Sequence, residues 1–209
     1  MAEILPIIQT KLHRPPLPRD LVARPRLTNL YDRLLQEPLT LVSAPAGYGK
    51  STLISNWAES LNCPVAWLSL DEHDNDLAGF VSYFLMAMQT TFPAIGADTI
   101  ALIQGTEIPP SLFIARTLIN ELTLIEADFV LVLDDYHYIR STAVHDFVEE
   151  ILSHPPLHLH LVIGTRIDPP ISLSTFRARG QVIEIRLHDL RLTVEEAVVL
   201  FEKLFQPEN

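Results

Sequence analysis

Apolar and polar residues follow one another along this chain in blocks that switch between strand and helix periodicity. Five short apolar or alternating runs predict β-strands, and apolar residues recur at helical spacing between them. Because a strand that alternates with a helix favours parallel pairing, the pattern predicts an α/β protein with a parallel sheet covered on both faces. The expected strands are 39–43, 65–70, 129–133, 158–164 and 182–187, and the expected helices are 51–60, 77–90, 112–126, 143–152 and 172–179.

The two ends of the chain depart from this alternation. Residues 13–25 contain four prolines, which favours an extended arm laid against the domain rather than a helix or a central strand. A short amphipathic helix is expected at 27–35. Near the other end, Thr193 and Glu196 have the spacing of a capping box, which predicts a final amphipathic helix.

The longest irregular connection covers residues 92–110, with room for a short helix at 98–104. We interpret it as a surface loop. The division that follows is an extended arm at 1–26, an α/β domain at 27–190 and the first helix of a further helical domain at 191–209.

The strongest chemical signal is a small-residue loop between the first strand and its helix. Residues 44–51 fit the phosphate-binding (Walker A) pattern G-x-x-x-x-G-K-[ST], with Ala44 in place of the first glycine. Glycines in such a loop let backbone amides converge on phosphate oxygens, and the N-terminus of the following helix adds positive partial charge. Lys50 is expected to reach the β- and γ-phosphates, and Ser51 to bind Mg²⁺. The expected nucleotide-binding residues of this loop are Ala46, Gly47, Tyr48, Gly49, Lys50, Ser51 and Thr52.

A second apolar strand ends in the carboxylates that a phosphate-loop site needs (Walker B). Asp134 and Asp135 follow the run at 129–133. Asp134 is expected to hold Mg²⁺, directly or through water, and Asp135 to orient or deprotonate the attacking water. Asp is one methylene shorter than the Glu that many hydrolytic ATPases use at this position. The inference is slow turnover, which suits a switch better than a motor.

The strand at 158–164 ends in Thr165 and Arg166. Because Asp134 must reach the metal from one strand away, this strand is expected between the phosphate-loop strand and the Asp134 strand. The fold that follows is a P-loop NTPase, a three-layer α/β/α structure whose five-stranded parallel sheet has the order 5-1-4-3-2. Thr165 and Arg166 are candidate sensors of the γ-phosphate. The expected catalytic residues are Asp135, Lys50 and Arg166.

Other suggestive side chains favour a structural explanation. Arg177 and Arg179 are either contact residues or exposed charges at a helix end, and we favour the second reading. His158 and His160 alternate on one strand face, but no cysteine or acidic residue stands at metal-ligand spacing. The acidic stretch 71–76 lacks the glycine and terminal glutamate of a calcium-binding loop, so it predicts a strand end and a helix cap.

Composition narrows the class of protein. The 209 residues carry 15 basic and 26 acidic side chains, a net charge of −11, with +3 on residues 1–33 and −14 on the rest. An acidic body disfavours nucleic-acid binding by this chain itself. Cys63 is the sole cysteine, no apolar run reaches the roughly 18 residues of a membrane span, and no basic signal-peptide region opens the chain. We expect a protein of the reducing cytoplasm that does not bind membranes.

The ordered set of motifs resembles the nucleotide-binding domain of the maltose-regulator-like, large ATP-binding LuxR-type transcriptional regulators. These belong to the STAND class of signalling P-loop ATPases, which are relatives of the NB-ARC proteins. The segments that carry the resemblance are 10–16, 21–27, 43–51, 67–71, 133–137, 165–166 and 190–197.

This resemblance implies further roles. The segment 21–24 would pack on adenine, with Val22 and Arg24 contributing to the nucleotide site, although a purely structural arm stays an alternative. ADP would hold a closed resting form, and inducer with ATP would open it for self-association and transcription activation. Family members continue into helical, winged-helix, sensor and helix-turn-helix portions. DNA binding is therefore expected outside this chain, which looks like an excised or truncated ATPase module.

Two other functions stay open. P-loop nucleotide kinases have similar lengths and carry arginines in a mobile lid, a role that Arg177 and Arg179 could imitate. The chain could also be an interaction module that binds a nucleotide and never hydrolyses it. A GTPase is disfavoured because the sequence contains no Asn-Lys-x-Asp segment that would read guanine.

Overall fold

Five parallel strands form the sheet at the centre of the protein. The computed structural model describes residues 7–18, 20–28 and 35–205. The strands are β1 (Leu39–Ser43), β2 (Val65–Ser69), β3 (Phe129–Asp134), β4 (Leu159–Thr165) and β5 (Val182–Arg186), in the order β2-β3-β4-β1-β5. This is the predicted order read from the other edge, and every pair is parallel. The predicted P-loop NTPase arrangement is confirmed.

The sheet register places polar residues together at one end. Ser43 of β1 is paired with Thr165 of β4 on one side and with Arg186 of β5 on the other. Asp134 closes β3 opposite Ser69 of β2. Since β1, β3 and β4 are buried and largely apolar before these positions, polar side chains converge at the carboxyl edge of the sheet.

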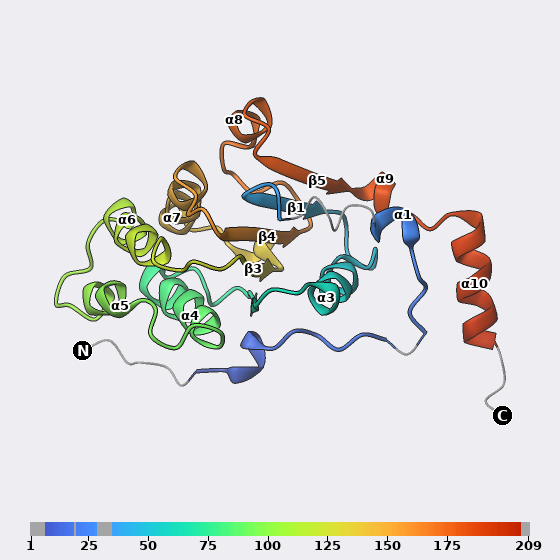
Figure 1. The fold of residues 1–209 in the computed structure, drawn as a ribbon, viewed down its shortest axis with the longest axis horizontal. Helices are drawn as coiled ribbons and strands as arrows, with labels where there is room; N and C mark the ends of the chain where they lie inside the picture. The colour runs from blue at the N-terminus through green and yellow to red at the C-terminus, as the bar shows by residue number, and fades with distance from the viewer. Residues whose placement is uncertain (1–6, 19, 29–34, 206–209) are drawn as a thin grey trace.

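Helices cover both faces of the sheet, as Figure 1 shows. One face packs against α4, α6, α7 and α8 through the larger apolar core, and the other packs mainly against α3, with α1 and α9 at its margin. The helices have these bounds: α1 (Pro25–Thr28), α3 (Lys50–Ser60), α4 (Leu77–Gln89), α5 (Ala97–Ile103), α6 (Ser111–Leu122), α7 (Thr142–Ser153), α8 (Leu173–Ala178), α9 (Leu187–Leu190) and α10 (Val194–Phe205), with short 3₁₀ turns η1 (Gln9–Leu12) and η2 (Tyr136–Tyr138).

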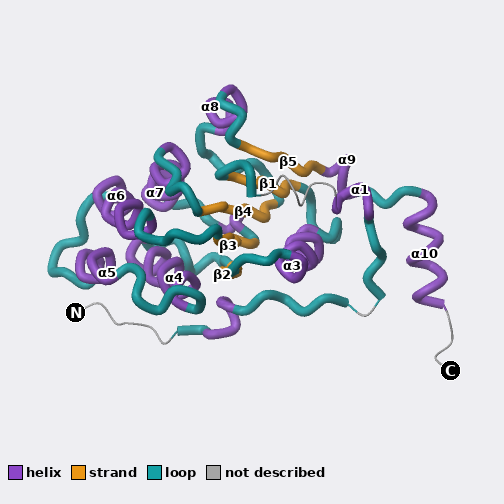
Figure 2. Tube along the Cα trace, in the orientation of Figure 1, coloured by secondary structure: helices purple, strands orange, loops and turns teal. Residues whose placement is uncertain are grey.

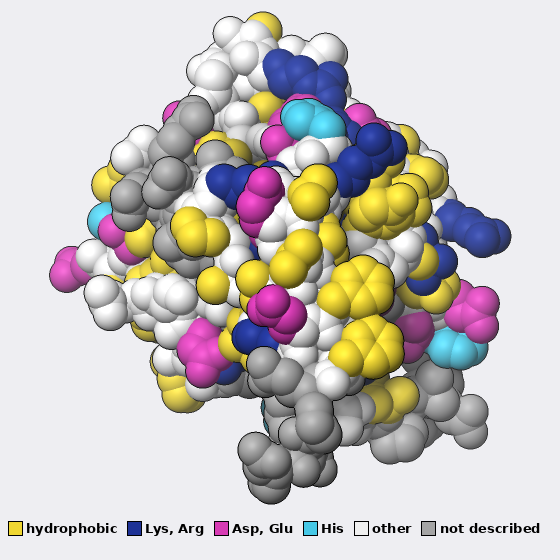
Figure 3. All heavy atoms as spheres, turned by 90° about the vertical axis from the view of Figure 1, so that its right-hand side faces the viewer, with side chains coloured by type: hydrophobic (Ala, Val, Ile, Leu, Met, Phe, Trp, Pro, Cys, Tyr) yellow, Lys and Arg dark blue, Asp and Glu magenta, His cyan; other side chains and the backbone are white. Residues whose placement is uncertain are grey.

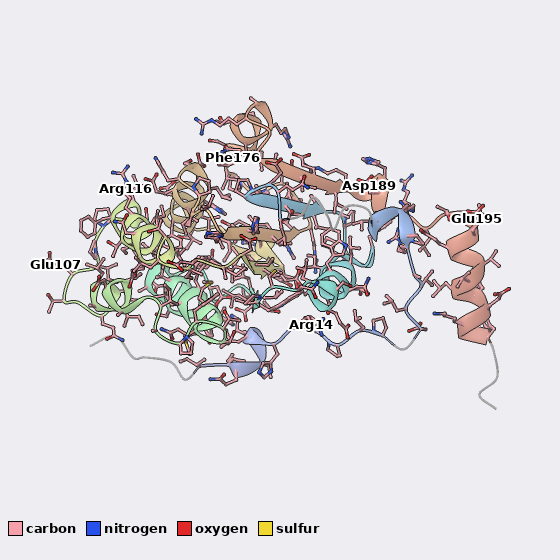
Figure 4. The ribbon with its side chains drawn as sticks, viewed as in Figure 1. Arg14, Glu107, Arg116, Phe176, Asp189 and Glu195 are labelled. Carbon is pink, nitrogen blue, oxygen red and sulfur yellow. The ribbon has the colours of Figure 1, made fainter. Side chains whose placement is uncertain are left out.

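The arm at the start of the chain is extended over most of its described length. It runs as loop from η1, beneath the sheet and past α3, to α1 (Figure 2). Arg14, labelled in Figure 4, donates a hydrogen bond of 2.8 Å to the Ser55 carbonyl, and the Ser55 hydroxyl donates one of 2.6 Å to the Pro15 carbonyl. The expected helix at 27–35 begins at Pro25, and its residues 29–34 lie outside the described part.

The structure shows the connection at 92–110 and the caps of α4 and α10 in detail. The connection at 92–110 contains the short helix α5, which packs through buried Thr99 and Ile103 instead of lying wholly on the surface. Asp76 caps α4 by accepting a hydrogen bond of 2.8 Å from the Gly79 amide, as predicted. The capping box of α10 is also present: Thr193 and Glu196 exchange backbone-to-side-chain hydrogen bonds of 3.1 and 3.2 Å.

Helix α10 stands at one end of the molecule with much of its apolar surface exposed. Val194, Phe201 and Phe205 are 77%, 61% and 75% exposed. The face of the molecule that carries α10 shows hydrophobic side chains bordered by charged ones (Figure 3). Among the described residues, no helix combines the length and the apolar character needed to cross a membrane.

Candidate nucleotide-binding site

The phosphate loop connects β1 to the first turn of α3. Gly47 and Gly49 have φ values of +83° and +75°, in the left-handed region where residues with a side chain are strained. A Cβ at either position would meet no atom within 4 Å, so backbone conformation, and not space, accounts for these glycines. The loop residues 45–49 are exposed, which leaves their amides open to a ligand.

Lys50 is the first residue of α3 and is only 7% exposed. Its ammonium group donates a hydrogen bond of 3.1 Å to the Pro45 carbonyl, within the same loop. Burial lowers the pKa of Lys50, while the charges of Asp135 and Asp134 oppose that shift and Arg166 adds to it. The loop lysine, the two aspartates and the arginine are thus close enough to influence one another.

Asp134 is a buried carboxylate at the end of β3, 2% exposed. Burial raises its pKa, against the opposing effects of the Ser51 hydroxyl, the Asp135 amide and Lys50. The space for this carboxylate comes from Gly164 on β4, where a Cβ would stand 2.5 Å from Asp134 Oδ1. A hydroxyl and a carboxylate oxygen are ligands that Mg²⁺ accepts, so the donor set fits the expected metal.

Asp135 and His137 form a second group beside Asp134. Asp135 is the one described residue other than glycine with a positive φ, 57°, a conformation that turns the chain sharply after β3. His137 Nδ1 lies 3.8 Å from Asp135 Oδ1. Both ring nitrogens of His137 are buried and have no hydrogen-bond partner among the described residues. Burial lowers the pKa of His137, and the charge of Arg166 adds to the effect, so the site favours the neutral ring.

His137 is the site residue that residue-level reasoning missed. The one signal in the sequence is its position two residues after Asp135, inside the segment 133–137 that carries the family resemblance. A lone histidine after a strand has no distinctive periodicity, so the pattern alone gave it no role.

Thr165 and Arg166 differ in how free their side chains are. The Thr165 hydroxyl donates a hydrogen bond of 2.7 Å to the Ile167 carbonyl, and the Thr165 carbonyl accepts one of 3.2 Å from the Ala44 amide. Thr165 therefore ties β4 to the phosphate loop in this structure. Arg166 is exposed, and its charge acts on Lys50 and His137. The sensor role of both residues stays a prediction.

A largely apolar cavity of about 290 Å³ lies beside the phosphate loop. Its walls come from the arm, from the first turns of α3 and from the region of α10. Both Val22 and Arg24 line it, next to Gly49 and Thr52, so the arm residues expected near adenine lie next to the phosphate loop. The lining residues are Pro18, Asp20, Leu21, Val22, Arg24, Gly49, Thr52, Leu53, Asn56, Leu192 and Leu200.

The guanidinium groups of Arg24 and Arg26 bind the start of α10. Arg24 Nε lies 3.3 Å and Arg26 Nε 2.9 Å from the Glu196 carboxylate, which is mostly buried. Both arginines also donate to backbone carbonyls of Asp189 and Arg191. Asp189 and Glu195, labelled in Figure 4, mark this end of the molecule. Arg24 therefore joins the arm to α9 and α10, a role that no sequence pattern predicts.

The remaining suggestive residues have structural partners. Arg177 is bound by Glu184 at 2.5 Å and lies 3.6 Å from Asp168. His158 is hydrogen-bonded to Asp128 at 2.8 Å, and the described residues contain no group of three or more His, Cys, Asp or Glu that could hold a metal ion. Asp71 and Asp74 of the acidic stretch bind Lys11 of the arm.

Comparison with known proteins places these features in context. The HTH-type transcriptional regulator MalT of Klebsiella pneumoniae subsp. pneumoniae is 35% identical over 196 residues, and the MalT of Yersinia enterocolitica is 33% identical over the same length. The match covers 94% of this chain and 22% of each relative, so the chain spans about a fifth of their length. No family model matches the chain.

Solved structures show the same fold at low sequence identity. A Walker-type ATPase of Pyrococcus abyssi superposes with a TM-score of 0.57 at 13% identity, covering 95% of this chain and 62% of that one. Cdc6p of Pyrobaculum aerophilum gives a TM-score of 0.52 at 16% identity, covering 85% of this chain and 49% of that one. Both support the P-loop ATPase architecture.

Proposed function

The chain is a homologue of one segment of the MalT-like HTH-type transcriptional regulators and has the P-loop ATPase fold, and on this premise we propose that it is an ATP- and ADP-binding switch module. The observation that carries the proposal is the placement of buried Lys50 at the start of α3, within electrostatic reach of Asp134, Asp135 and Arg166. Lys50 follows β1, the two aspartates lie at the end of β3 and Arg166 follows β4, so charged groups from three strands lie near one glycine-rich loop.

In this proposal the nucleotide lies across the phosphate loop. The amides of Ala46, Gly47, Tyr48 and Gly49 and the ammonium group of Lys50 bind the phosphates. Thr52 and Val22 face the base or ribose in the apolar cavity, whose volume of about 290 Å³ is at the lower end of the range for small-molecule pockets. Arg24 contributes by holding one wall of that cavity in place.

Hydrolysis would use the residues that surround the γ-phosphate position. Ser51 and Asp134 would hold Mg²⁺, which supplies charge neutralisation on the phosphates when bound. Asp135 orients the attacking water and accepts its proton, and the neutral His137 ring beside it limits where the Asp135 carboxylate can turn. Arg166 donates to the γ-phosphate oxygens. The short reach of Asp135 supports slow turnover.

The wider biological role extends beyond this chain. We propose that it serves a signal-responsive transcriptional regulator, in which self-association and DNA binding belong to other parts of the protein. The net charge of −11 supports this division, because it disfavours contact between this module and nucleic acid. The exposed apolar side of α10 supports the assignment of residues 191–209 to the beginning of a helical domain. The expected location is the cytoplasm.

Calorimetry tests the nucleotide site. ADP and a non-hydrolysable ATP analogue, each with Mg²⁺, should bind the wild-type chain, and Lys50→Ala should weaken both by at least about tenfold. Arg116→Ala is the control, because the Arg116 side chain on α6 is 67% exposed; this variant should bind both nucleotides like wild type. If wild type binds neither nucleotide, or Lys50→Ala binds both as well as wild type does, the proposal is wrong.

Turnover separates the two alternative functions. Phosphate release over many cycles, abolished by Asp135→Ala, would exclude a binding module without hydrolysis. Transfer of radiolabel from ATP to a nucleoside monophosphate would instead support a nucleotide kinase. The ion pairs of Arg177 with Glu184 and Asp168 argue against a lid role for that arginine.

A further inference from the structure

A second cavity, of about 400 Å³, lies on another side of the phosphate loop from the base cavity. Residues 43–45, where β1 passes into the loop, form one wall. The other walls carry four basic side chains, Arg166, Arg186, His188 and Arg191, and no acidic side chain lines the cavity. The cavity lining thus gathers basic side chains and no acidic one, in a chain whose net charge is −11.

The four basic side chains differ in how their charge is balanced. Arg186 is held by Asp168 and Glu184, which compensate its charge and fix its position. His188 Nε2 lies 3.1 Å from the Asp189 carboxylate. Arg166 and Arg191 form no side-chain hydrogen bond or ion pair within the part of the chain that the structure describes. Two guanidinium groups without a direct ion-pair partner among the described residues thus face one cavity, and an anion there would relieve their repulsion.

The backbone holds Arg191 beside this cavity. Its carbonyl accepts hydrogen bonds of 2.9 Å from Arg24 and 2.5 Å from Arg26, so the arm fixes the chain at the point where the Arg191 side chain starts. Arg166 belongs to both sides of the site: it lines the cavity, and its charge acts on Lys50 and His137 at the expected γ-phosphate position. Arg166 therefore links the basic cavity to the phosphate loop, because its charge acts on both.

We propose that this cavity is a second anion site that takes a small tetrahedral oxyanion, inorganic phosphate. Guanidinium groups match such an ion because their parallel N–H donors can bind two of its oxygens at once. That the ion in the cell is the phosphate released from ATP rests on the proposed function. Arg166 would then contact the γ-phosphate before hydrolysis and the free phosphate after it.

The test uses the full chain loaded with ADP and Mg²⁺, the state that follows hydrolysis, in which no γ-phosphate competes for Arg166. Calorimetric titration with inorganic phosphate should show saturable binding, weakened about tenfold or more by Arg191→Ala. Arg191→Lys, which keeps the charge, should recover part of the loss. Arg179→Ala is the control, because Arg179 is exposed and does not line the cavity; it should bind phosphate like wild type.

Three results would overturn the proposal. The first is the absence of saturable phosphate binding, and the second is phosphate binding that Arg191→Ala leaves unchanged. The third is competition by acetate at the concentration at which phosphate binds, because this would indicate a protein carboxylate as the natural ligand. Failure of the proposed function is distinguishable, because ADP itself would then not bind wild type. In that case the same phosphate titration on the unloaded Lys50→Ala chain decides whether the cavity binds anions.

Discussion

Lys11 and Asp74 form a buried ion pair that fastens the arm to the edge of the sheet. The Lys11 ammonium group lies 2.6 and 2.5 Å from the two carboxylate oxygens of Asp74, and the two residues are 8% and 2% exposed. Asp71 adds a third contact at 3.1 Å, and the ammonium group also stands 4.7 Å from the centre of the Tyr83 ring. Because η1 packs against β2, this pair covers an edge strand that would otherwise be open to association with another strand.

Loss of the lysine should therefore destabilise the whole domain. Lys11→Met leaves the Asp74 carboxylate buried without its cation, which we expect to lower the free energy of unfolding by roughly 3 kcal/mol. Urea denaturation followed by circular dichroism measures the change. Arg14→Met, which removes a more exposed arm contact, should cost about 1 kcal/mol, and Lys11→Met combined with Asp74→Asn should recover part of the loss. If Lys11→Met and Arg14→Met lowered the free energy of unfolding equally, the buried pair would contribute no more to stability than the exposed contact.

The sequence was sufficient for features whose cause is local. The five strands were predicted within one residue at each end because buried strands of a parallel sheet are continuous apolar runs. The positions of the phosphate loop before α3 and of Asp134 at the end of β3 were also predicted, because the motif ties each to the end of an apolar strand. The strand order followed from chemistry, because Asp134 has to lie one strand away from the loop.

Contacts between distant segments could not be predicted in the same way. Lys11 and Asp74 are 63 positions apart, and Arg24 and Glu196 are 172 positions apart. Nothing in the pattern around an arginine in a proline-rich arm says which carboxylate it meets. The resemblance to a family pointed Arg24 toward the nucleotide, whereas its observed hydrogen bonds go to α9 and α10.

Asp134 should carry a stability cost that its metal relieves. Burial raises the pKa of Asp134, so the folded protein disfavours the charged carboxylate, and this penalty is present above the unfolded pKa of about 3.9 and absent well below it. Asp134→Asn should therefore raise the melting temperature of the nucleotide-free protein at pH 7 by a few degrees, and the gain should vanish near pH 3. Calorimetric scans at both pH values measure this, with Asp135→Asn as the more exposed control.

The same variant should lose what the carboxylate provides. Added Mg²⁺ with ADP should raise the melting temperature of wild type more than that of Asp134→Asn, because a ligand that binds only the folded state stabilises it. A variant that is less stable than wild type at pH 7 without metal, or that keeps the full response to Mg²⁺, would contradict this account of the site.

Glu196 should affect binding of the base without affecting binding of the phosphates. Its carboxylate accepts from Arg24, Arg26 and the Thr193 amide, and these contacts hold the arm against α10 on either side of the base cavity. Glu196→Ala should weaken ADP about tenfold and leave the affinity for pyrophosphate within about twofold, because pyrophosphate needs only the phosphate loop.

The neighbouring residue gives a matched control for that experiment. Glu195 is on the same helical turn and is exposed, so Glu195→Ala should change neither affinity. Calorimetry with each ligand on each variant measures the difference. An equal loss of ADP and pyrophosphate binding in Glu196→Ala would mean that the substitution disturbs the phosphate loop and not the base cavity.

Gly164 should be indispensable because it makes room for Asp134. A Cβ added on β4 at this position would stand 2.5 Å from Asp134 Oδ1 and 3.1 Å from Ile54 Cδ1, so the carboxylate and α3 would both have to move. Gly164→Ala should lower the free energy of unfolding by about 1–3 kcal/mol and should abolish the Mg²⁺-dependent part of nucleotide binding.

Gly79→Ala is the control. Gly79 lies in α4, and a Cβ there would be 3.4 Å from the nearest atom. Because alanine is the better helix former, the free energy of unfolding should stay level or rise by about 0.5 kcal/mol. Urea denaturation and calorimetry with ADP, with and without Mg²⁺, measure both effects. Normal Mg²⁺-dependent binding in a folded Gly164→Ala protein would show that Asp134 does not have to occupy this space when the nucleotide is bound.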